Sequence, residues 1–526
     1  MKPPCDEGII RSAGDGVPCR DKSGPWVLAA AILGSSMAFI DSTVVNVALP
    51  ALQSSFRTTV VDVQWVIESY GLFLSALILA GGALGDIVGR RFMFVIGVLL
   101  FAAASAVCGF SPTIRQLIVG RSIQGIGAAL LVPGSLGIIS ASFTEDSRGR
   151  AIGTWSGFTA ITSAMGPVLG GWLIEHASWH WVFFINLPMA AAVVAITLWH
   201  VPESRNPVGG HIDWLGALAA SAGLGGIVNG LIESQTHGWR DPLVLGSLVV
   251  GAACLVGFVV AEAKVSSPMV PLELFQSRAF AGANLLTLCL YAALGIFFFL
   301  FPLNLIQVRQ YSATATGAAM LPMILLMFSL SRWSGGLVTR YGPRTPLIVG
   351  PLIAALGFAL FAMPGTTGSY WRTFFPAFVV LGLGMAVSVA PLTTLVMSSV
   401  DGDHAGTASG INNAVARVAG VLAIAIFGVL MVSVFAFRLA HFLWHFGIPS
   451  AVSQQVEANA IQLAGLQLPA SLDPARSGII RTGIAQAFVS GFRLITMLCA
   501  GLGIASSIVA WKMIPVKSAA SVDAID

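Results

Sequence analysis

Apolar runs of membrane length recur along this 526-residue sequence, and about 20 apolar residues are enough for a helix to cross a bilayer. Apolar residues make up 56% of the chain and charged residues only 10%, compared with roughly 25% charged residues in an ordinary soluble domain. The sequence therefore predicts an all-α integral membrane protein. We place fourteen transmembrane helices at residues 26–50, 62–86, 92–110, 115–140, 150–174, 181–201, 212–232, 242–262, 279–305, 314–338, 345–364, 374–398, 405–437 and 483–514.

A glycine-rich stretch with charges, Gly82–Arg91, connects the second and third of these helices and returns as Gly335–Arg344. The copies are 253 residues apart, measured from Gly89 to Gly342, and that length holds roughly eight helices. Because eight is even, the two copies face the same side of the membrane, which indicates two related halves built on one plan. The repeat predicts two six-helix bundles related by pseudo-two-fold symmetry, with two further helices inserted between them. The predicted parts are an N-terminal tail at 1–24, a bundle at 25–205, the inserted helices at 206–277, a bundle at 278–515 and a tail at 516–526.

The distribution of Lys and Arg predicts the orientation, because cytoplasmic loops carry an excess of both. With both termini in the cytoplasm, fifteen basic residues fall on that side and eight on the other. The one long external segment is then 438–482, which contains Gln454, Gln455, Asn459, Gln462 and Gln467 among small apolar residues. It can hold a short amphipathic helix, and we interpret it as a tolerated loop in preference to a specificity lid.

Several function classes find no support in the residues. The net charge of +4 comes from scattered bases, so nucleic acid is not an expected partner. Six dispersed cysteines form neither a disulfide framework nor a metal site, and no cofactor is expected. No phosphate-binding G-x-x-x-x-G-K-[ST] motif occurs, which argues against an ATP-driven pump and against an enzyme of that kind.

Ionisable residues inside the predicted helices are candidates for function, because a charge costs roughly 2.5 to 3.5 kcal/mol at the centre of a membrane helix. Asp41, Glu68 and Arg121 lie at a similar predicted depth, roughly 8 to 9 Å from the outer edge of the apolar core. We predict that Asp41 and Glu68 bind a proton, or a proton and a cationic substrate in competition, while Arg121 biases their charge. The alternative is a static ion pair that only holds helices together.

Small residues in the fifth predicted helix indicate close packing. Gly153 with Gly157, and Gly166 with Gly170, are each four residues apart and lie on one helix face. Pro167 lacks a backbone donor there and should bend the helix. We predict a tight contact between bundles on which exchange depends, and ordinary close packing is the alternative.

A substrate cavity between the bundles is predicted from polar and aromatic residues in the helices. In the second half, Arg417 and Arg493 lie inside predicted helices and could bind an anionic group, pair with the acids of the first half or reach a polar cavity. The charge of the substrate therefore stays open. The candidate cavity residues are Asn46, Gln124, Trp155, Asn413 and Arg417.

Five motifs in order resemble those of the major facilitator superfamily, and specifically its fourteen-helix drug/proton antiporter family. They are Asp41–Pro50, Gly82–Arg91, Arg121–Gly127, Gly166–Gly171 and Trp179–Pro188. The resemblance implies a helix 1 aspartate that serves coupling, an antiporter motif at Gly166, Pro167, Gly170 and Gly171, and a cytoplasmic gate at Gly82, Asp86, Gly89, Arg90 and Arg91. The chain departs from the family pattern at Ile87, Thr339 and His180.

These observations lead to the expectation of a proton-coupled secondary antiporter that exports amphipathic drugs or toxic compounds across the cytoplasmic membrane by alternating access. A dedicated exporter of one lipid, peptide or metabolite, and a non-transporting receptor or scaffold, are the alternatives. The expected partners are the proton, a small amphipathic substrate and the lipid bilayer. A periplasmic adaptor would be added if the host has two membranes, and a monomer is favoured.

Overall fold

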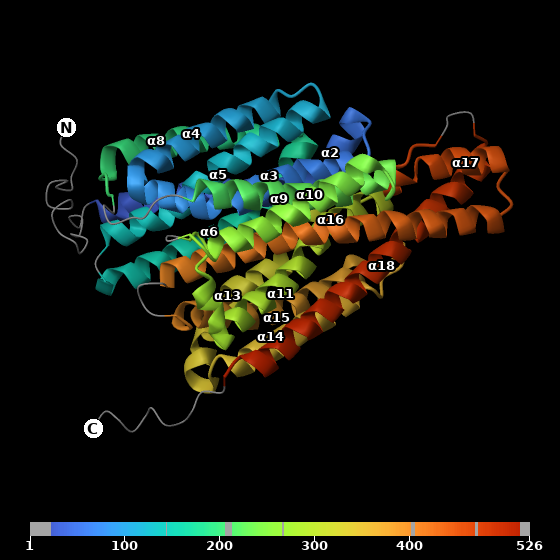
Figure 1. Ribbon diagram of the computed structural model, residues 1–526. Helices are drawn as coiled ribbons and strands as arrows, with labels where there is room; N and C mark the ends of the chain where they lie inside the picture. The colour runs from blue at the N-terminus through green and yellow to red at the C-terminus, as the bar shows by residue number, and fades with distance from the viewer. Residues whose placement is uncertain are drawn as a thin grey trace. The chain divides into compact units, whose positions relative to one another are not determined.

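The structure is a computed structural model that describes residues 23–143, 145–205, 213–265, 268–400, 405–468 and 472–515, and over these ranges it consists of helices, turns and loops (Figure 1). Fourteen helical segments in these ranges are long and apolar enough to cross a membrane, which confirms the predicted number. The α-helices are α2 (Gly24–Phe56), α3 (Val60–Val88), α4 (Arg90–Gly109), α5 (Ile114–Ser142), α6 (Glu145–His176), α7 (Trp181–Phe184), α8 (Asn186–His200), α9 (Trp214–His237), α10 (Pro242–Glu262), α11 (Arg278–Leu303), α12 (Ala313–Ala318), α13 (Leu321–Tyr341), α14 (Arg344–Phe361), α15 (Tyr370–Ser398), α16 (Ala405–His445), α17 (Ser450–Ala458) and α18 (Pro474–Met513). Three short helices of other kinds complete the list: the 3₁₀ helices η1 (Leu272–Gln276) and η4 (Ala460–Gly465) and the π-helix η2 (Asn304–Val308).

Contacts divide the chain into two compact units, which we describe separately. The first comprises Met1–Met269, Phe299–Ala318 and Ile424–Phe488, and the second comprises Val270–Phe298, Ala319–Ala423 and Val489–Asp526. These units do not test the predicted arrangement of two six-helix bundles with two helices inserted between them, which remains a prediction.

In the first unit, α3 and α4 both pack against α5, α2 packs against α6, and the helix pair α9 and α10 joins through α3 (Figure 1). Small residues allow these approaches. A Cβ atom at Gly81 of α3 would lie only 2.1 Å from the carbonyl oxygen of Ala129 of α5, so the two backbones touch.

In the second unit, α15 packs against α13 and α14. A group of phenylalanine rings fills the interior, with Phe297 of α11 within 4.6 Å of Phe361 between ring centroids and 6.1 Å of Phe378. All three rings are buried. Their edge-on and tilted arrangements are those that aromatic rings favour.

The segment predicted to be external, 438–482, differs from the prediction at both ends. Helix α16 continues to His445 and α18 already begins at Pro474, so the connection is shorter than 438–482. The reason is packing: the ring of Phe442 lies against Gly483, where an added Cβ would come within 2.4 Å, so each helix supports the extension of the other. The connection contains α17, which agrees with the predicted short helix.

Both copies of the glycine-rich stretch end a helix in the same way. Gly89 follows α3 with φ of 139°, and Gly342 follows α13 with φ of 72°. Side chains other than glycine rarely adopt these angles. The matched glycines of the repeat are therefore both helix ends, one in each unit.

Candidate functional site

Asp41 of α2 is fully buried and is the centre of a polar cluster. Its Oδ2 accepts a hydrogen bond from Nη1 of Arg121 in α5, with which it forms an ion pair. Its Oδ1 accepts from Nε2 of Gln124 at 2.8 Å and from Nδ2 of Asn186 at 3.1 Å. Three donors, one of them a charged guanidinium, therefore bond to the two carboxyl oxygens of Asp41.

Arg121 is also buried, and its guanidinium has several partners besides Asp41. Its Nε donates to the carbonyl oxygen of Val66 at 3.1 Å, and Nη1 also donates to Oε1 of Gln124 at 2.8 Å. The guanidinium carbon lies 4.2 Å from the centroid of the Tyr70 ring, a distance typical of a cation–π contact. A buried ion pair is tolerated when its remaining groups are bonded in this way.

Asn186 and Ser105 complete this cluster, and neither was among the predicted site residues. Ser105 of α4 accepts from Asn186 at 3.0 Å and from Gln124 at 3.3 Å, and its own hydroxyl donates to the carbonyl oxygen of Phe183 at 2.8 Å. Asn186 lies within the motif Trp179–Pro188, so the available signal was a polar residue at the start of an apolar helix. The cluster joins α2, α4, α5 and α8.

Glu68 of α3 is also fully buried, but both of its carboxyl oxygens lack a hydrogen-bond partner among the described residues. Glu68 is two residues from Val66 and from Tyr70, which both contact Arg121, so it points to the opposite side of α3. The predicted group of three charges is therefore divided. Asp41 and Arg121 are together, and Glu68 is apart.

The side of α3 that carries Glu68 is turned towards α9 and α16. Gln64, one turn earlier, donates to the carbonyl oxygen of Ile424 in α16 at 2.9 Å. Trp65 donates from Nε1 to Oε1 of Glu233 in α9 at 3.0 Å. Glu68 therefore lies at an interface that includes a helix predicted to be inserted between the two bundles.

The predicted gate residues lie where α3 ends and α4 begins. Asp86 pairs with Arg90 of the following helix at 2.7 Å, and both side chains are partly exposed. Gly89 separates them, and a Cβ there would come within 2.8 Å of the carboxyl group of Glu203. Gly82 lies one turn before Asp86 and faces Pro133 of α5.

Glu203 lies beside the predicted gate residues and was not among the residues predicted from the sequence. Its carboxylate accepts hydrogen bonds from the backbone N–H groups of Arg91 at 3.0 Å and Phe92 at 3.1 Å, at the start of α4. Its Oε2 lies 3.9 Å from Nε of Arg91. The buried carboxylate accepts from backbone N–H groups that have no partner within the first turn of α4, and its negative charge interacts favourably with the positive end of the helix dipole.

The antiporter motif of α6 is a site of close backbone contact. A Cβ at Gly166 would lie 2.0 Å from Oγ1 of Thr43, and one at Gly170 would lie 2.4 Å from Cγ2 of Val44, both in α2. A Cβ at Gly171 would lie 2.3 Å from the carbonyl oxygen of Ala313, where α12 begins.

The reverse contact exists as well, because a Cβ at Gly317 of α12 would lie 2.1 Å from the carbonyl oxygen of Pro167. The motif thus joins α6 to a segment of the predicted second bundle. For Gly153 and Gly157 the prediction of a close approach is wrong, since a Cβ at either position would meet no described atom within 4 Å.

The predicted cavity residues have separate environments. Trp155 is buried against Ala31 and Ile139 and donates from Nε1 to Ser35 at 3.1 Å. Asn46 donates to the carbonyl oxygen of Ser42 in its own helix at 3.2 Å.

Gln124 belongs to the Asp41 cluster, whereas Asn413 and Arg417 are half-buried residues of α16 in the second unit. Beside them, Asn412 donates to Oγ1 of Thr287 in α11 at 2.7 Å. Arg493 of α18 donates to the carbonyl oxygen of Met363 at 3.1 Å, also within the second unit.

Comparisons with known proteins agree with the motifs. Residues 31–424 match the family model described as Major Facilitator Superfamily. The chain is 32% identical over 524 residues to the tetracenomycin C resistance and export protein of Streptomyces glaucescens, a match that covers 96% of this chain and 93% of that protein. It is 34% identical over 446 residues to the multidrug resistance protein Stp of Mycobacterium tuberculosis, with 82% and 80% covered.

Two solved structures share the fold. A bacterial homologue of the human lysosomal transporter Spinster, in an inward-facing and unoccupied conformation, has a TM-score of 0.64 at 17% identity, covering 95% of this chain and 100% of that chain. The inward-open xylose transporter XylE from E. coli has a TM-score of 0.56 at 13% identity, covering 94% and 97%. At these identities the likeness establishes the major facilitator fold and carries no information on substrate.

Proposed function

This chain belongs to the Major Facilitator Superfamily and is a multi-pass membrane transporter, and we propose that it is a proton-coupled secondary antiporter that exports amphipathic drugs or other toxic compounds. The names of its relatives support export as the direction, because they describe resistance and export proteins. Alternating access of a major facilitator fold is the mechanism that we assign to it.

The observation that carries the proposal is the carboxyl group of Glu68. An ionised carboxylate without partners in a buried site would cost several kcal/mol, so the protonated form is favoured in the conformation described. A change of conformation that admits water or a basic group to this site would favour release of the proton. A buried acid that can hold one proton and lose it on opening is the minimum requirement for proton coupling.

Asp41 and Arg121 have a different part in the proposal. Their ion pair has additional hydrogen bonds from Gln124 and Asn186, so Asp41 can take up a proton only when the cluster opens. We propose that the transport cycle opens it, and that Asp41 is the second proton-binding group. The resemblance of Asp41–Pro50 to the helix 1 motif of the antiporter family supports this assignment.

The gate and the domain organisation are part of the same proposal. Asp86 with Arg90, and Glu203 with the start of α4, would hold the cytoplasmic gate closed on the side of both chain termini. The two six-helix bundles would rock about the contacts of Gly166, Pro167, Gly170 and Gly171, with the inserted helices at 206–277 placed against α3. The predicted cavity residues would contact the substrate from both bundles.

Transport in proteoliposomes tests the function. With a pH gradient imposed across the membrane, the wild-type protein should move fluorescent amphipathic dyes against protons and should stop when the gradient is collapsed. Glu68→Gln, which imitates the protonated carboxyl, should lose gradient-driven movement and retain dye exchange down a concentration gradient.

Glu457→Gln is the matched control, because Glu457 is an exposed glutamate of α17 and should transport as wild type does. Gradient-driven transport by Glu68→Gln at the wild-type rate would contradict the role of Glu68. Dye movement by the wild type that does not respond to the gradient would contradict proton coupling altogether.

A further inference from the structure

A cavity of about 500 Å³ opens in the first unit at the end of α2. Its lining includes Gln53 and Arg57 of α2, Gln307 of η2, and Gln462 and Gln467 of the segment that follows α17. A second cavity of about 480 Å³ adjoins it, because Gln307, Gln310, Ala464 and Gln467 line both, and it adds Arg481 of α18. We name the two together the amide vestibule. Volumes of this size are typical of small-molecule sites.

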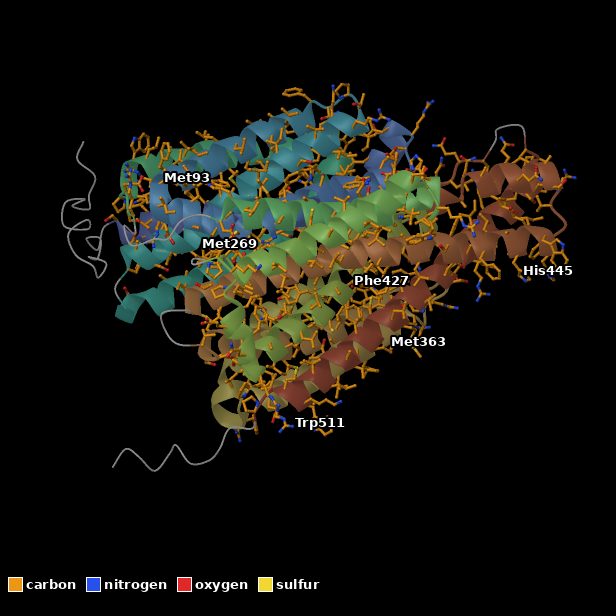
Figure 2. All side chains as sticks on the ribbon, viewed as in Figure 1. Met93, Met269, Met363, Phe427, His445 and Trp511 are labelled. Atoms are coloured by element: carbon orange, nitrogen blue, oxygen red, sulfur yellow. The ribbon has the colours of Figure 1, made fainter. Side chains whose placement is uncertain are left out.

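The vestibule lies far from the gate. Three residues separate the end of α2 from the start of α3, and α3 then runs for 29 residues before Gly89, which corresponds to about 43 Å. Figure 2 labels Met93, at the start of α4 near the gate, and His445, at the tip of α16 near α17, at opposite ends of the first unit. A compound that passes the gate would therefore meet the vestibule last.

Hydrogen bonds between three segments build its wall. Gln53 is buried and donates from Nε2 to the carbonyl oxygen of Gln462 at 3.0 Å, while its Oε1 accepts from Nε2 of Gln307 at 2.8 Å. Gly465 packs directly on these amides, since a Cβ there would lie 2.9 Å from Nε2 of Gln53 and 3.0 Å from Nε2 of Gln307. The segment after α17 is thus held in place by specific contacts.

Several polar groups remain available inside this wall. Oε1 of Gln307 is buried and has no hydrogen-bond partner in the part of the chain that the structure describes. Arg57 lines the first cavity and Arg481 the second, and both are exposed. The described lining residues include no Asp or Glu, so the charges of the lining are positive and lie among amide, hydroxyl and apolar side chains.

We propose that the amide vestibule is a binding site for compounds that are neutral or negatively charged and are rich in carbonyl and hydroxyl groups. Amide side chains both donate to and accept from such groups. The arginines favour an acidic group and disfavour a cation, so the site selects among amphipathic compounds. As the exit site of an exported compound it rests on the proposed function, and it names the substrate class which that function left open.

Binding to the full-length protein in nanodiscs, with no pH gradient, tests the proposal. The probes are fluorescein, an anion, and rhodamine 123, a cation with the same xanthene ring system, with binding followed by fluorescence anisotropy. Wild-type protein should bind fluorescein about tenfold more tightly than rhodamine 123. Equal or reversed affinities would overturn the proposed selectivity.

Charge-reversal variants test whether fluorescein binds in the vestibule. Arg481→Glu should weaken fluorescein binding by about tenfold and reduce the preference over rhodamine 123. Arg476→Glu is the matched control, because Arg476 is an exposed residue of the same helix outside both cavities, and it should change affinity by less than about twofold. The same loss in both variants would mean that the general surface charge, and not the vestibule, attracts the anion.

The amides are tested in the same way. Gln467→Leu should weaken fluorescein binding by about threefold to tenfold, whereas Gln454→Leu, an exposed glutamine of α17 outside the cavities, should not. Unchanged binding in Gln467→Leu and in Arg481→Glu would overturn the proposal.

Gradient-driven transport is measured separately. Selective binding without gradient-driven transport would contradict the proposed function and support the binding site. Gradient-driven transport with unselective binding would contradict the proposed binding site and support the proposed function.

Discussion

Asp41 and Glu68 are both fully buried carboxyl groups in membrane helices that follow one another, but they differ in their hydrogen bonds and in the packing of the backbone around them. Asp41 receives hydrogen bonds from an arginine, a glutamine and an asparagine. Glu68 has no hydrogen-bond partner among the described residues for either oxygen. The backbone around Asp41 is also tighter, because glycines of α6 contact α2 at Thr43 and Val44.

A buried acid can stabilise the fold through an ion pair, or it can remain unpaired and change its charge. Removing one partner of a bonded ion pair leaves an uncompensated charge, so Asp41 contributes to the stability of the helix bundle in the conformation described. An acid without partners contributes little to stability while it is neutral, and it can change its charge when its environment changes. In the conformation described, Asp41 is therefore a member of a bonded ion pair, whereas Glu68 is an acid without a hydrogen-bond partner among the described residues.

The largest expected effect is that of Asp41→Asn. It leaves the buried guanidinium of Arg121 without its counter-charge, so the free energy of unfolding should fall by about 3 to 5 kcal/mol. Thermal unfolding in detergent, followed by tryptophan fluorescence, measures the loss. Glu68→Gln is the comparison, with an expected change within about 0.5 kcal/mol. Equal losses in the two variants would break the distinction between the two acids.

The helices beside Asp41 should also tolerate an added methyl group less well than the helices beside Glu68. Gly170→Ala places a Cβ 2.4 Å from Val44 of α2 and should cost about 1 to 3 kcal/mol in stability and slow transport. Gly225→Ala, in α9 on the side of Glu68, meets Leu72 only at 3.6 Å and should be neutral or stabilising by up to about 1 kcal/mol. If Gly225→Ala were as harmful as Gly170→Ala, the Glu68 side would be packed as tightly as the Asp41 side.

The ion pair at the gate should count for less in stability than the buried pair. Asp86→Ala removes a partly exposed contact with Arg90, so the free energy of unfolding should change by less than about 1 kcal/mol. Transport should nevertheless become slower without a change in which compounds bind, because the gate loses a closing contact. Transport rates and dye affinities of the same preparation check this. An altered substrate profile at a normal rate would refute the gating role.

The smallest expected effect depends on pH and lies at the end of α2. His180 stacks on Trp179, which bonds to Ser55 of α2, and burial lowers the pKa of the His180 imidazole. The unfolded chain therefore binds this proton more readily, and the contribution to stability is complete above the unfolded pKa of about 6.5 and decreases as the pH falls through it.

His180→Gln should remove the part of the loss of stability at low pH that comes from protonation of His180. The difference in unfolding temperature between wild type and variant, measured from pH 8 down to about pH 5, tests it. A difference that stays constant over this range would show that His180 does not titrate on unfolding.

Much of the architecture could be predicted without coordinates, because a membrane helix is a local property of its own residues. A run of about 20 apolar residues must satisfy its backbone internally in a bilayer, so each run predicted one helix, and the count of fourteen is confirmed. The repeat of Gly89 and Gly342 was also visible, because only glycine readily adopts the backbone angles found at both positions. The ends of α16 and α18 were missed, because mutual packing and not the apolar run extends them.

The environment of each site residue depended on the tertiary structure. The sequence identified Asp41, Glu68 and Arg121 as charges at one depth, since the rise along a helix sets depth. It could not assign their partners, since these depend on how each helix is rotated about its axis and on which helix lies beside it. That rotation brings Asn186 to Asp41 and turns Glu68 to the other side of α3. Ser105 joins the cluster through Asn186 and Gln124, and Glu203 reaches the start of α4 from the segment that follows α8. Hydropathy determines that a helix crosses the membrane, and side-chain packing between helices decides which buried charges are paired.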